Sequence, residues 1–192
     1  QTREIYLPSS VFGSICEALE GIDLEIGPNA EANRKVLVEG EAYLCRAREI
    51  IGQLVRPGVA REALADLEGL SVLDEHQVEA VAIATHPEML GMCLFDEQGL
   101  GKTVTTLFAF HCLKEKRLIS AMLVLCPKNM VLEWQRDAER FFPGRHRCQA
   151  VLGTIRQKRQ TLESDADIYI TNFETPVRLF LRLKALLESR KP

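Results

Sequence analysis

Short apolar runs alternate with amphipathic segments throughout the second half of the chain, and this alternation restricts the fold more than any other feature. Strands are expected where an apolar run is short, and helices where apolar residues recur every three or four positions. The expected strands are residues 91–95, 121–126, 149–152 and 167–171, and the expected helices are residues 71–84, 102–116, 129–142 and 175–189. This order predicts an α/β fold, a parallel sheet flanked by helices, in which ligands bind where the strands end.

Residues 1–70 lack this alternation. Apolar residues recur at helical spacing in residues 9–20 and 41–54, and a Gly-Pro-Asn turn at residues 27–29 separates the two stretches. No pattern typical of catalysis or ligand binding occurs in this part. We therefore expect a small helix-rich appended segment here, followed by one α/β lobe at residues 71–192.

Composition and cysteine spacing exclude several classes of protein. The chain has 192 residues, 46% of them hydrophobic and 27% charged, as in soluble globular proteins, and no apolar run approaches the roughly 18 residues that cross a bilayer. The six cysteines are scattered, and the spacing of His111 and Cys112 from His146 and Cys148 does not fit a zinc site. We expect reduced thiols, no membrane partner and an intracellular location, in the bacterial cytoplasm and nucleoid or in a nucleus. A first residue other than methionine favours a piece of a longer protein.

Charge is distributed unevenly along the chain. Residues 1–70 and 71–103 each carry a net charge of −5, whereas residues 104–192 carry 16 Lys+Arg against 9 Asp+Glu. A basic stretch of this kind favours a surface that binds nucleic acid, because contacts to phosphates dominate such affinity. A solvated helical surface explains the same excess equally well.

The strongest motif follows the first expected strand and opens the next helix. It consists of Asp96, Glu97, Gln98, Gly99, Leu100, Gly101, Lys102 and Thr103. The two glycines permit backbone angles that turn N–H groups inward around a phosphate, and the helix N-terminus adds its dipole. Lys102 would then contact the β- and γ-phosphates of a nucleotide, and the Thr103 hydroxyl would ligate magnesium. The common phosphate-loop pattern has glycine at the position of Asp96, so this loop is a variant; a glycine-rich turn with a chance Lys-Thr pair is the alternative.

The loop resembles the first ATPase motif of the Swi/Snf-type DNA translocases, a family in helicase superfamily two, whose loop typically reads Asp-Glu-Met-Gly-Leu-Gly-Lys-Thr. In that family, aspartate is usual at the position of Asp96. Residues 73–81 resemble the family's glutamine motif, which implies that Gln77 reads the adenine edge of ATP. A carboxamide suits adenine because it offers a donor and an acceptor side by side. Without the loop that follows it, Gln77 would be interpreted as an exposed helical residue.

Residues 123–134 resemble the family's second conserved segment, a strand, a proline turn and a helix. The resemblance implies that Lys128 and Asn129 hold a DNA phosphate at the turn. Asn129 as a plain helix cap is an equally good account of that residue. In the same helix, Trp134 lies at core spacing and is interpreted as a core residue.

Residues 167–174 resemble the family's strand that ends in Thr-Ser-Tyr-Glu. The resemblance implies that Thr171 and Asn172 touch the DNA strand being tracked. Between the two segments, Arg156 belongs to a basic group that either lines the DNA path or forms a solvated face.

Taken together, these motifs imply the first RecA-like lobe of a motor that uses ATP and magnesium to move along double-stranded DNA. The partners implied are duplex DNA and a second RecA-like lobe. The family's Asp-Glu box does not follow Thr175, so hydrolysis is expected of the complete protein and this segment alone is expected to be inactive. Two alternatives stay open. One is the motor of a restriction, defence or RNA helicase, and the other is a module that binds nucleotide or DNA without hydrolysis.

Overall fold

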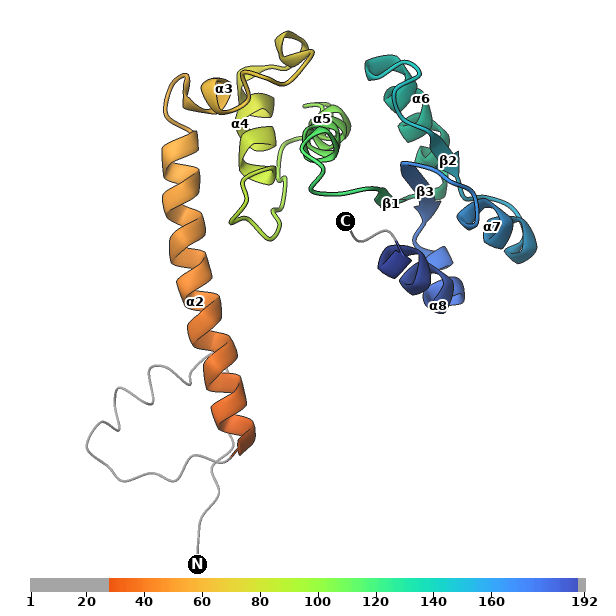
Figure 1. The fold of residues 1–192 in the computed structure, drawn as a ribbon, viewed down its shortest axis with the longest axis horizontal. Coiled ribbons are helices and arrows are strands. Elements are labelled where there is room, and N and C mark those ends of the chain that lie inside the picture. Colours follow the sequence, from red (N-terminus) through yellow and green to blue (C-terminus); the bar gives the residue numbers. More distant parts are fainter. Residues whose placement is uncertain (1–27, 190–192) are drawn as a thin grey trace, which may run out of the picture. The chain divides into compact units, whose positions relative to one another are not determined.

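The computed structural model describes residues 28–189, and the helix expected at residues 9–20 lies outside this range. The chain divides into two compact units, residues 1–53 and 54–192. In the first unit, the structure describes α2, a helix at Pro28–Leu54 (Figure 1). The helix expected at residues 41–54 is confirmed, but the turn expected before it is instead the start of α2. Proline is well suited to the first turn of a helix, because its missing N–H would have no partner there.

The second unit begins with short helical elements that lead to the phosphate loop: α3 (Val59–Ala63), η2 (Leu70–Val72) and α4 (Glu75–Ala84). Asp74 caps α4, and the side chain of Gln77 accepts a hydrogen bond from the Asp74 N–H at 3.1 Å. The helix expected at residues 71–84 therefore begins about one turn later than predicted, because Ser71 belongs to η2. Beyond the loop, α5 (Lys102–Glu115) has the expected bounds and packs against α4.

Within residues 28–189, the sheet has three parallel strands in the order β1-β3-β2. They are β1 (Met122–Cys126), β2 (Cys148–Ala150) and β3 (Ile168–Asn172). Every residue of the central strand β3 is buried. In the register, Cys126 of β1 lies opposite Asn172, and Ala150 of β2 lies opposite Ile170. The predicted parallel sheet is therefore confirmed for these three strands.

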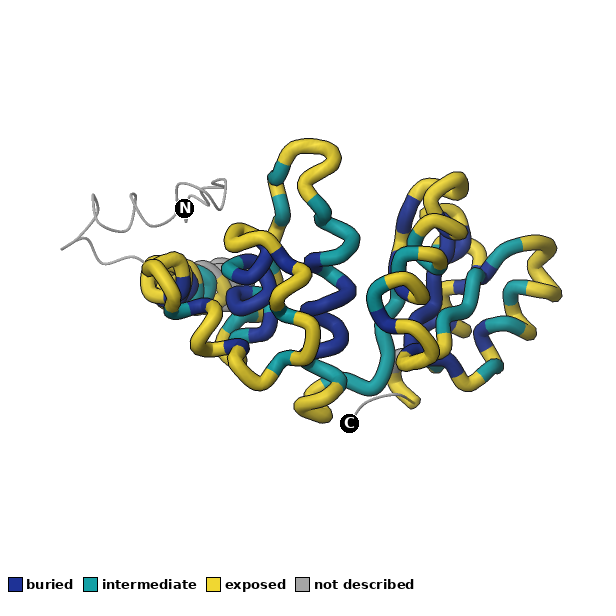
Figure 2. The backbone as a smooth tube through the Cα atoms, turned by 90° about the horizontal axis from the view of Figure 1, so that it is seen from above, coloured by how far each residue is buried: buried dark blue, intermediate teal, exposed yellow. Residues whose placement is uncertain are grey.

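A helical element follows each strand: η3 (Lys128–Met130) and α6 (Val131–Phe141), then α7 (Ile155–Leu162), and then α8 (Glu174–Ser189). Tyr169 of β3 packs with Leu162 of α7 and with Leu179 and Leu183 of α8. Figure 2 shows buried residues gathered in two places, among the helices before the sheet and again around the sheet. The helix α7 was not predicted, because its residues are mostly polar. The available signal was the pair of Thr154 and Gln157, which form a capping box at its start.

The strand expected at residues 91–95 is not formed. No strand is assigned there, and the side chains of Leu90 and Phe95 are 86% and 92% exposed. A strand is stabilised by hydrogen bonds to a neighbouring strand. The three described strands pair only with one another, so this apolar run has no strand beside it.

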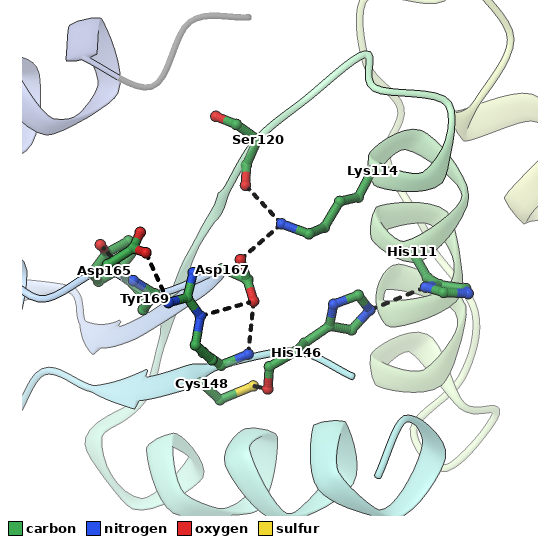
Figure 3. A network of polar contacts seen from close by, with 10 residues as sticks. His111, Lys114, Ser120, His146, Cys148, Asp165, Asp167 and Tyr169 are labelled. Atoms are coloured by element: carbon green, nitrogen blue, oxygen red, sulfur yellow. Dashed lines mark hydrogen bonds and ion pairs between the residues drawn. The ribbon is translucent and has the colours of Figure 1, made fainter. Parts of the chain in front are cut away.

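A polar cluster holds the amino ends of the strands together (Figure 3). Lys114 of α5 donates to Asp167 Oδ1 at 2.8 Å and to the Ser120 carbonyl at 3.1 Å. The backbone N–H of Arg147 donates to Asp167 Oδ2, also at 2.8 Å. Burial acts to raise the pKa of Asp167, but the hydrogen bonds from Lys114 and Arg147 outweigh it, so the pKa is lowered. Asp167 is therefore an ionised carboxylate that joins α5 to the strands.

Two imidazole rings lie in the core beside this cluster. His111 Nδ1 and His146 Nε2 are 3.1 Å apart, and both residues are buried (Figure 3). Both rings also contact Phe142. Burial lowers the pKa of both histidines, and for His146 the neighbouring His111 lowers it further. The pair is therefore neutral at neutral pH and acts as part of the apolar core.

Candidate nucleotide site and nucleic-acid interface

The phosphate loop has the backbone conformation that its glycines allow. Gly99 and Gly101 adopt positive φ angles of 96° and 79°. α5 begins immediately after the loop, at Lys102, so the free N–H groups of its first turn follow the loop directly. The positive end of the α5 dipole therefore adjoins the loop, as the binding of an anion requires.

Two features of the structure disfavour any residue other than glycine at position 101. Its φ is in the left-handed region, and a Cβ added to it would lie 2.3 Å from Nε2 of Gln77. By contrast, a Cβ added to Gly99 would meet no atom within 4 Å. Thus Gly101 permits the close approach of α4 to the loop, whereas Gly99 borders open space.

Gln77 joins α4 to the loop. Its Nε2 donates to the carbonyl of Leu100 at 3.1 Å, while its Oε1 accepts from the Asp74 N–H, so both halves of the carboxamide are engaged. Nε2 of the adjacent His76 also lies 3.3 Å from the Leu100 carbonyl. Gln77 is only 7% exposed, which rules out the interpretation as an exposed helical residue. The adenine contact stays a prediction, and an adenine would compete with these protein partners.

Lys102 folds back over the loop that precedes it. Its Nζ donates to the carbonyl oxygens of Asp96 and Glu97, each at 2.8 Å. Both acceptors are neutral carbonyls, and no carboxylate forms an ion pair with Lys102 in the described part of the chain. The ammonium charge is therefore available to an anion in the loop.

Thr103 differs from the two threonines that follow it in α5. Thr105 and Thr106 donate their hydroxyl protons to backbone carbonyls one turn earlier, at 3.2 and 2.8 Å. Within residues 28–189, the hydroxyl of Thr103 has no hydrogen-bond partner. Among the remaining loop residues, Asp96 is half-buried, and Glu97, Gln98 and Leu100 are exposed. Thr103 thus has a hydroxyl without a hydrogen-bond partner in the described part of the chain, and it lies next to Lys102 in the sequence.

A second candidate site lies at the carboxyl edge of the sheet. Because the strands are parallel and in the stated register, the segments that follow them meet at this edge. Lys128 and Asn129 follow β1, and Arg156 follows β2 in the first turn of α7. All three residues are exposed. The structure therefore brings these three predicted residues to one edge.

Thr171 and Asn172 have different surroundings from those expected. They are 0% and 5% exposed. The hydroxyl of Thr171 donates to the Val151 carbonyl at 3.0 Å, and the Asn172 side chain bonds to Glu174 and to Lys158. Their polar groups are engaged within the protein, so DNA contact by these two residues stays a prediction that requires rearrangement.

The described residues also form a cavity, and none of the predicted site residues lines it. This cavity of about 510 Å³ is lined by Phe108, Phe141 and Phe142 together with polar and charged residues, among them the ion pair of Glu68 and Arg145. Within residues 28–189, no three His, Cys, Asp or Glu side chains group as a metal site would require. None of the helices described combines the length and apolarity that crossing a bilayer requires.

Comparison with known proteins agrees with the motifs. Residues 74–190 match the model of the SNF2-related domain. The chain is 32% identical over 85 residues to the ATP-dependent helicase fft1 of Schizosaccharomyces pombe, which covers 42% of this chain and 9% of that protein. It is 36% identical over 58 residues to the DNA excision repair protein CSB of Oryza sativa subsp. japonica, which covers 30% of this chain and 5% of that protein.

A solved structure also resembles the fold. It is the Sulfolobus solfataricus SWI2/SNF2 ATPase core in complex with double-stranded DNA, with a TM-score of 0.50 and 25% identity over 55% of this chain and 22% of that chain. This chain thus spans less than a quarter of each of these known proteins. The small parallel sheet with its helices corresponds to part of a RecA-like ATPase lobe. Because the SNF2-related model matches more than half of its residues, the chain belongs to the SNF2-related domain family, within helicase superfamily two.

Proposed function

We propose that residues 71–192 form part of the first ATP-binding lobe of a motor that hydrolyses ATP and moves along double-stranded DNA, with residues 1–70 as an appended segment. The observation that carries this proposal is the loop between α4 and α5. It combines two glycines at positive φ, an ammonium held only by neutral carbonyls and an uncommitted threonine hydroxyl at the start of a helix.

The loop residues fit a magnesium nucleotide. Backbone N–H groups of the loop and of the first turn of α5 would hold the phosphates, as in other loops that end at a helix N-terminus. Lys102 would exchange its carbonyl partners for phosphate oxygens, because a charged acceptor binds an ammonium more strongly than a neutral one. The Thr103 hydroxyl would ligate magnesium, whose charge offsets that of the phosphates during phosphoryl transfer.

The carboxyl edge of the sheet fits the backbone of a nucleic acid. Lys128 and Arg156 supply exposed positive charge, and Asn129 supplies an exposed carboxamide. η3, α7 and α8 all begin at this edge, so their free N–H groups also favour phosphate. The similar Sulfolobus ATPase core was solved with double-stranded DNA, which supports duplex DNA as the partner.

ATP hydrolysis by the full-length protein tests the proposal. It is measured without nucleic acid, with duplex DNA, with single-stranded DNA and with RNA. We expect stimulation by duplex DNA and a loss of at least about 100-fold in the Lys102→Ala variant, because electrostatic stabilisation of the transferred phosphoryl group is removed. Lys116→Ala, an exposed lysine at the other end of α5, is the matched control and should retain activity.

The other outcomes decide against parts of the proposal. Stimulation by RNA alone would replace the DNA motor with an RNA helicase. Absence of hydrolysis under every condition would favour a module that binds nucleotide or nucleic acid without turnover. Substantial ATP hydrolysis by the Lys102→Ala variant would show that the loop is not part of the ATPase active site.

A further inference from the structure

Two lysines fasten helices to opposite ends of β3, and they differ in the charge of their partners. At the amino end, Lys114 of α5 pairs with the carboxylate of Asp167, whose side chain is only 11% exposed (Figure 3). Its positive charge is therefore balanced inside the protein. The ion pair with Asp167 is sufficient to explain why a lysine stands at position 114.

At the carboxyl end, Lys158 of α7 has only neutral acceptors. Its Nζ donates to Asn172 Oδ1 at 3.0 Å and to Thr175 Oγ1 at 2.6 Å. Glu174 is bonded to Asn172 Nδ2, and among the described residues no carboxylate forms an ion pair with Lys158. The ammonium therefore has no carboxylate as a direct partner, and it keeps one N–H beyond the two that it donates.

The acceptors of Lys158 are fixed in position. Thr175 is 1% exposed, and its hydroxyl donates to Asn172 Oδ1 at 2.7 Å. The hydroxyl of Thr171, which is completely buried, lies 2.8 Å from that of Thr175. Lys158 itself is only partly buried, and its ammonium group is held by these two buried acceptors. Little side-chain freedom is left to lose when an anion binds.

We propose that Lys158 is a phosphate-binding residue of the nucleic-acid interface, positioned by Asn172 and Thr175. The inference rests on the proposed function, because it takes the ligand to be a backbone phosphate of duplex DNA. Lys158 lies two positions after Arg156 in α7, the helix that follows β2. In this arrangement, Asn172 acts on DNA indirectly, by orienting the lysine that contacts it, and Thr171 contacts the hydroxyl of Thr175.

The test is the affinity of the full-length protein for duplex DNA as a function of salt concentration. Lys158→Gln keeps a hydrogen-bonding side chain but removes the charge. We expect roughly five- to tenfold weaker binding, and a slope of log affinity against log salt that is smaller by about one phosphate contact. Lys158→Arg should retain the slope. Lys184→Gln, an exposed α8 lysine near Glu188, is the control and should change neither quantity.

Thr175→Val tests the positioning separately. It keeps the charge of Lys158 but removes one of its two acceptors, so we expect about two- to threefold weaker binding with an unchanged salt slope. This variant also keeps the proposal falsifiable if Lys158→Gln does not fold. Unaltered affinity in Thr175→Val would overturn the positioning by this hydroxyl.

The outcomes separate this inference from the proposed function. If the unmodified protein binds duplex DNA and Lys158→Gln binds it with the same affinity and slope, Lys158 is only structural and the inference fails alone. If the unmodified protein binds no duplex DNA, both proposals fail. The KM for ATP, measured without nucleic acid, should be unchanged in Lys158→Gln; a raised KM with an unchanged salt slope would assign the lysine to nucleotide phosphate instead.

Discussion

The sheet and the phosphate loop are held in place by different means. β3 has a parallel neighbour on each side and is buried along its whole length. The loop lies between α4 and α5 and is held mainly by the side chains of Gln77 and Lys102, while Phe95 just before it is exposed. The sheet is therefore the rigid region, and the loop is the region that can exchange its partners for a ligand. Changes to the anchors of the sheet should lower stability, and changes to the anchors of the loop should weaken nucleotide binding.

The largest effect is expected at the amino end of the sheet. Asp167→Ala should lower the free energy of unfolding by about 3 kcal/mol, because Lys114 loses its carboxylate and the Arg147 N–H loses its acceptor. Denaturant titration measures this change. Asp165→Ala is the control: its ion pair with Arg147 is largely exposed, so its removal should change stability much less than Asp167→Ala does. Equal effects of the two variants would contradict the assigned role of Asp167.

In the loop, Gly101→Ala should weaken nucleotide binding by roughly tenfold or more, with a smaller change in global stability. The positive φ is unfavourable for alanine by about 1 to 2 kcal/mol, and the new Cβ displaces the amide of Gln77. Binding of a fluorescent ATP analogue measures the affinity. Gly91→Ala is the matched control, because its Cβ would meet no atom within 4 Å and its φ is ordinary. An equal loss in both variants would refute the specific contact.

Gln77→Ala should weaken nucleotide binding by a few-fold and lower the free energy of unfolding by about 1 to 2 kcal/mol, because two hydrogen bonds are removed. Combination with Gly101→Ala sharpens the comparison. In the Gln77→Ala background, the alanine at position 101 no longer displaces the Gln77 amide, so its effect should shrink to the backbone strain and the 3.0 Å approach to Val104 Cγ1. Strict additivity of the two changes would contradict the contact between them.

The smallest effect concerns pH and the core beside the sheet. The pKa of both His111 and His146 is lowered in the folded protein, mainly by burial, so the unfolded chain binds more protons once the pH falls below about 6.5. Stability should therefore decrease on acidification from pH 7 to 5.5. Denaturant titrations at the two pH values measure it. His146→Phe should flatten this dependence, and an unchanged pH dependence in that variant would contradict the assignment.

Local signals predicted the elements that depend on nearby residues. The bounds of α5 follow from helical spacing after Gly101, and β1 and β3 follow from compact apolar runs. The run at residues 91–95 carries a similar signal, yet whether it becomes a strand depends on a neighbouring strand, which can come from any part of the sequence. A local pattern does not contain that information.

The same limit applies to the candidate sites. The loop residues adjoin one another in sequence, so the motif located them. The pair of Lys114 and Asp167 joins residues 53 positions apart, and the pair of Lys158 and Asn172 joins residues 14 positions apart across two elements. Neither pairing leaves a local pattern. The burial of Asn172 could not be predicted either, because a polar residue at the end of a strand is buried only when a partner such as Lys158 lies beside it.

The carbonyl oxygens of Asp96 and Glu97 already accept hydrogen bonds from Lys102, so they occupy the lysine's donors until an anion replaces them. Binding of an anion is then an exchange of partners, in which the released carbonyls must find water or another donor. A ligand with a single weak charge gains little from such an exchange, whereas a polyphosphate that engages the lysine and the backbone N–H groups together gains much more. Under the proposed function, the exchange therefore favours ligands that carry several linked phosphates.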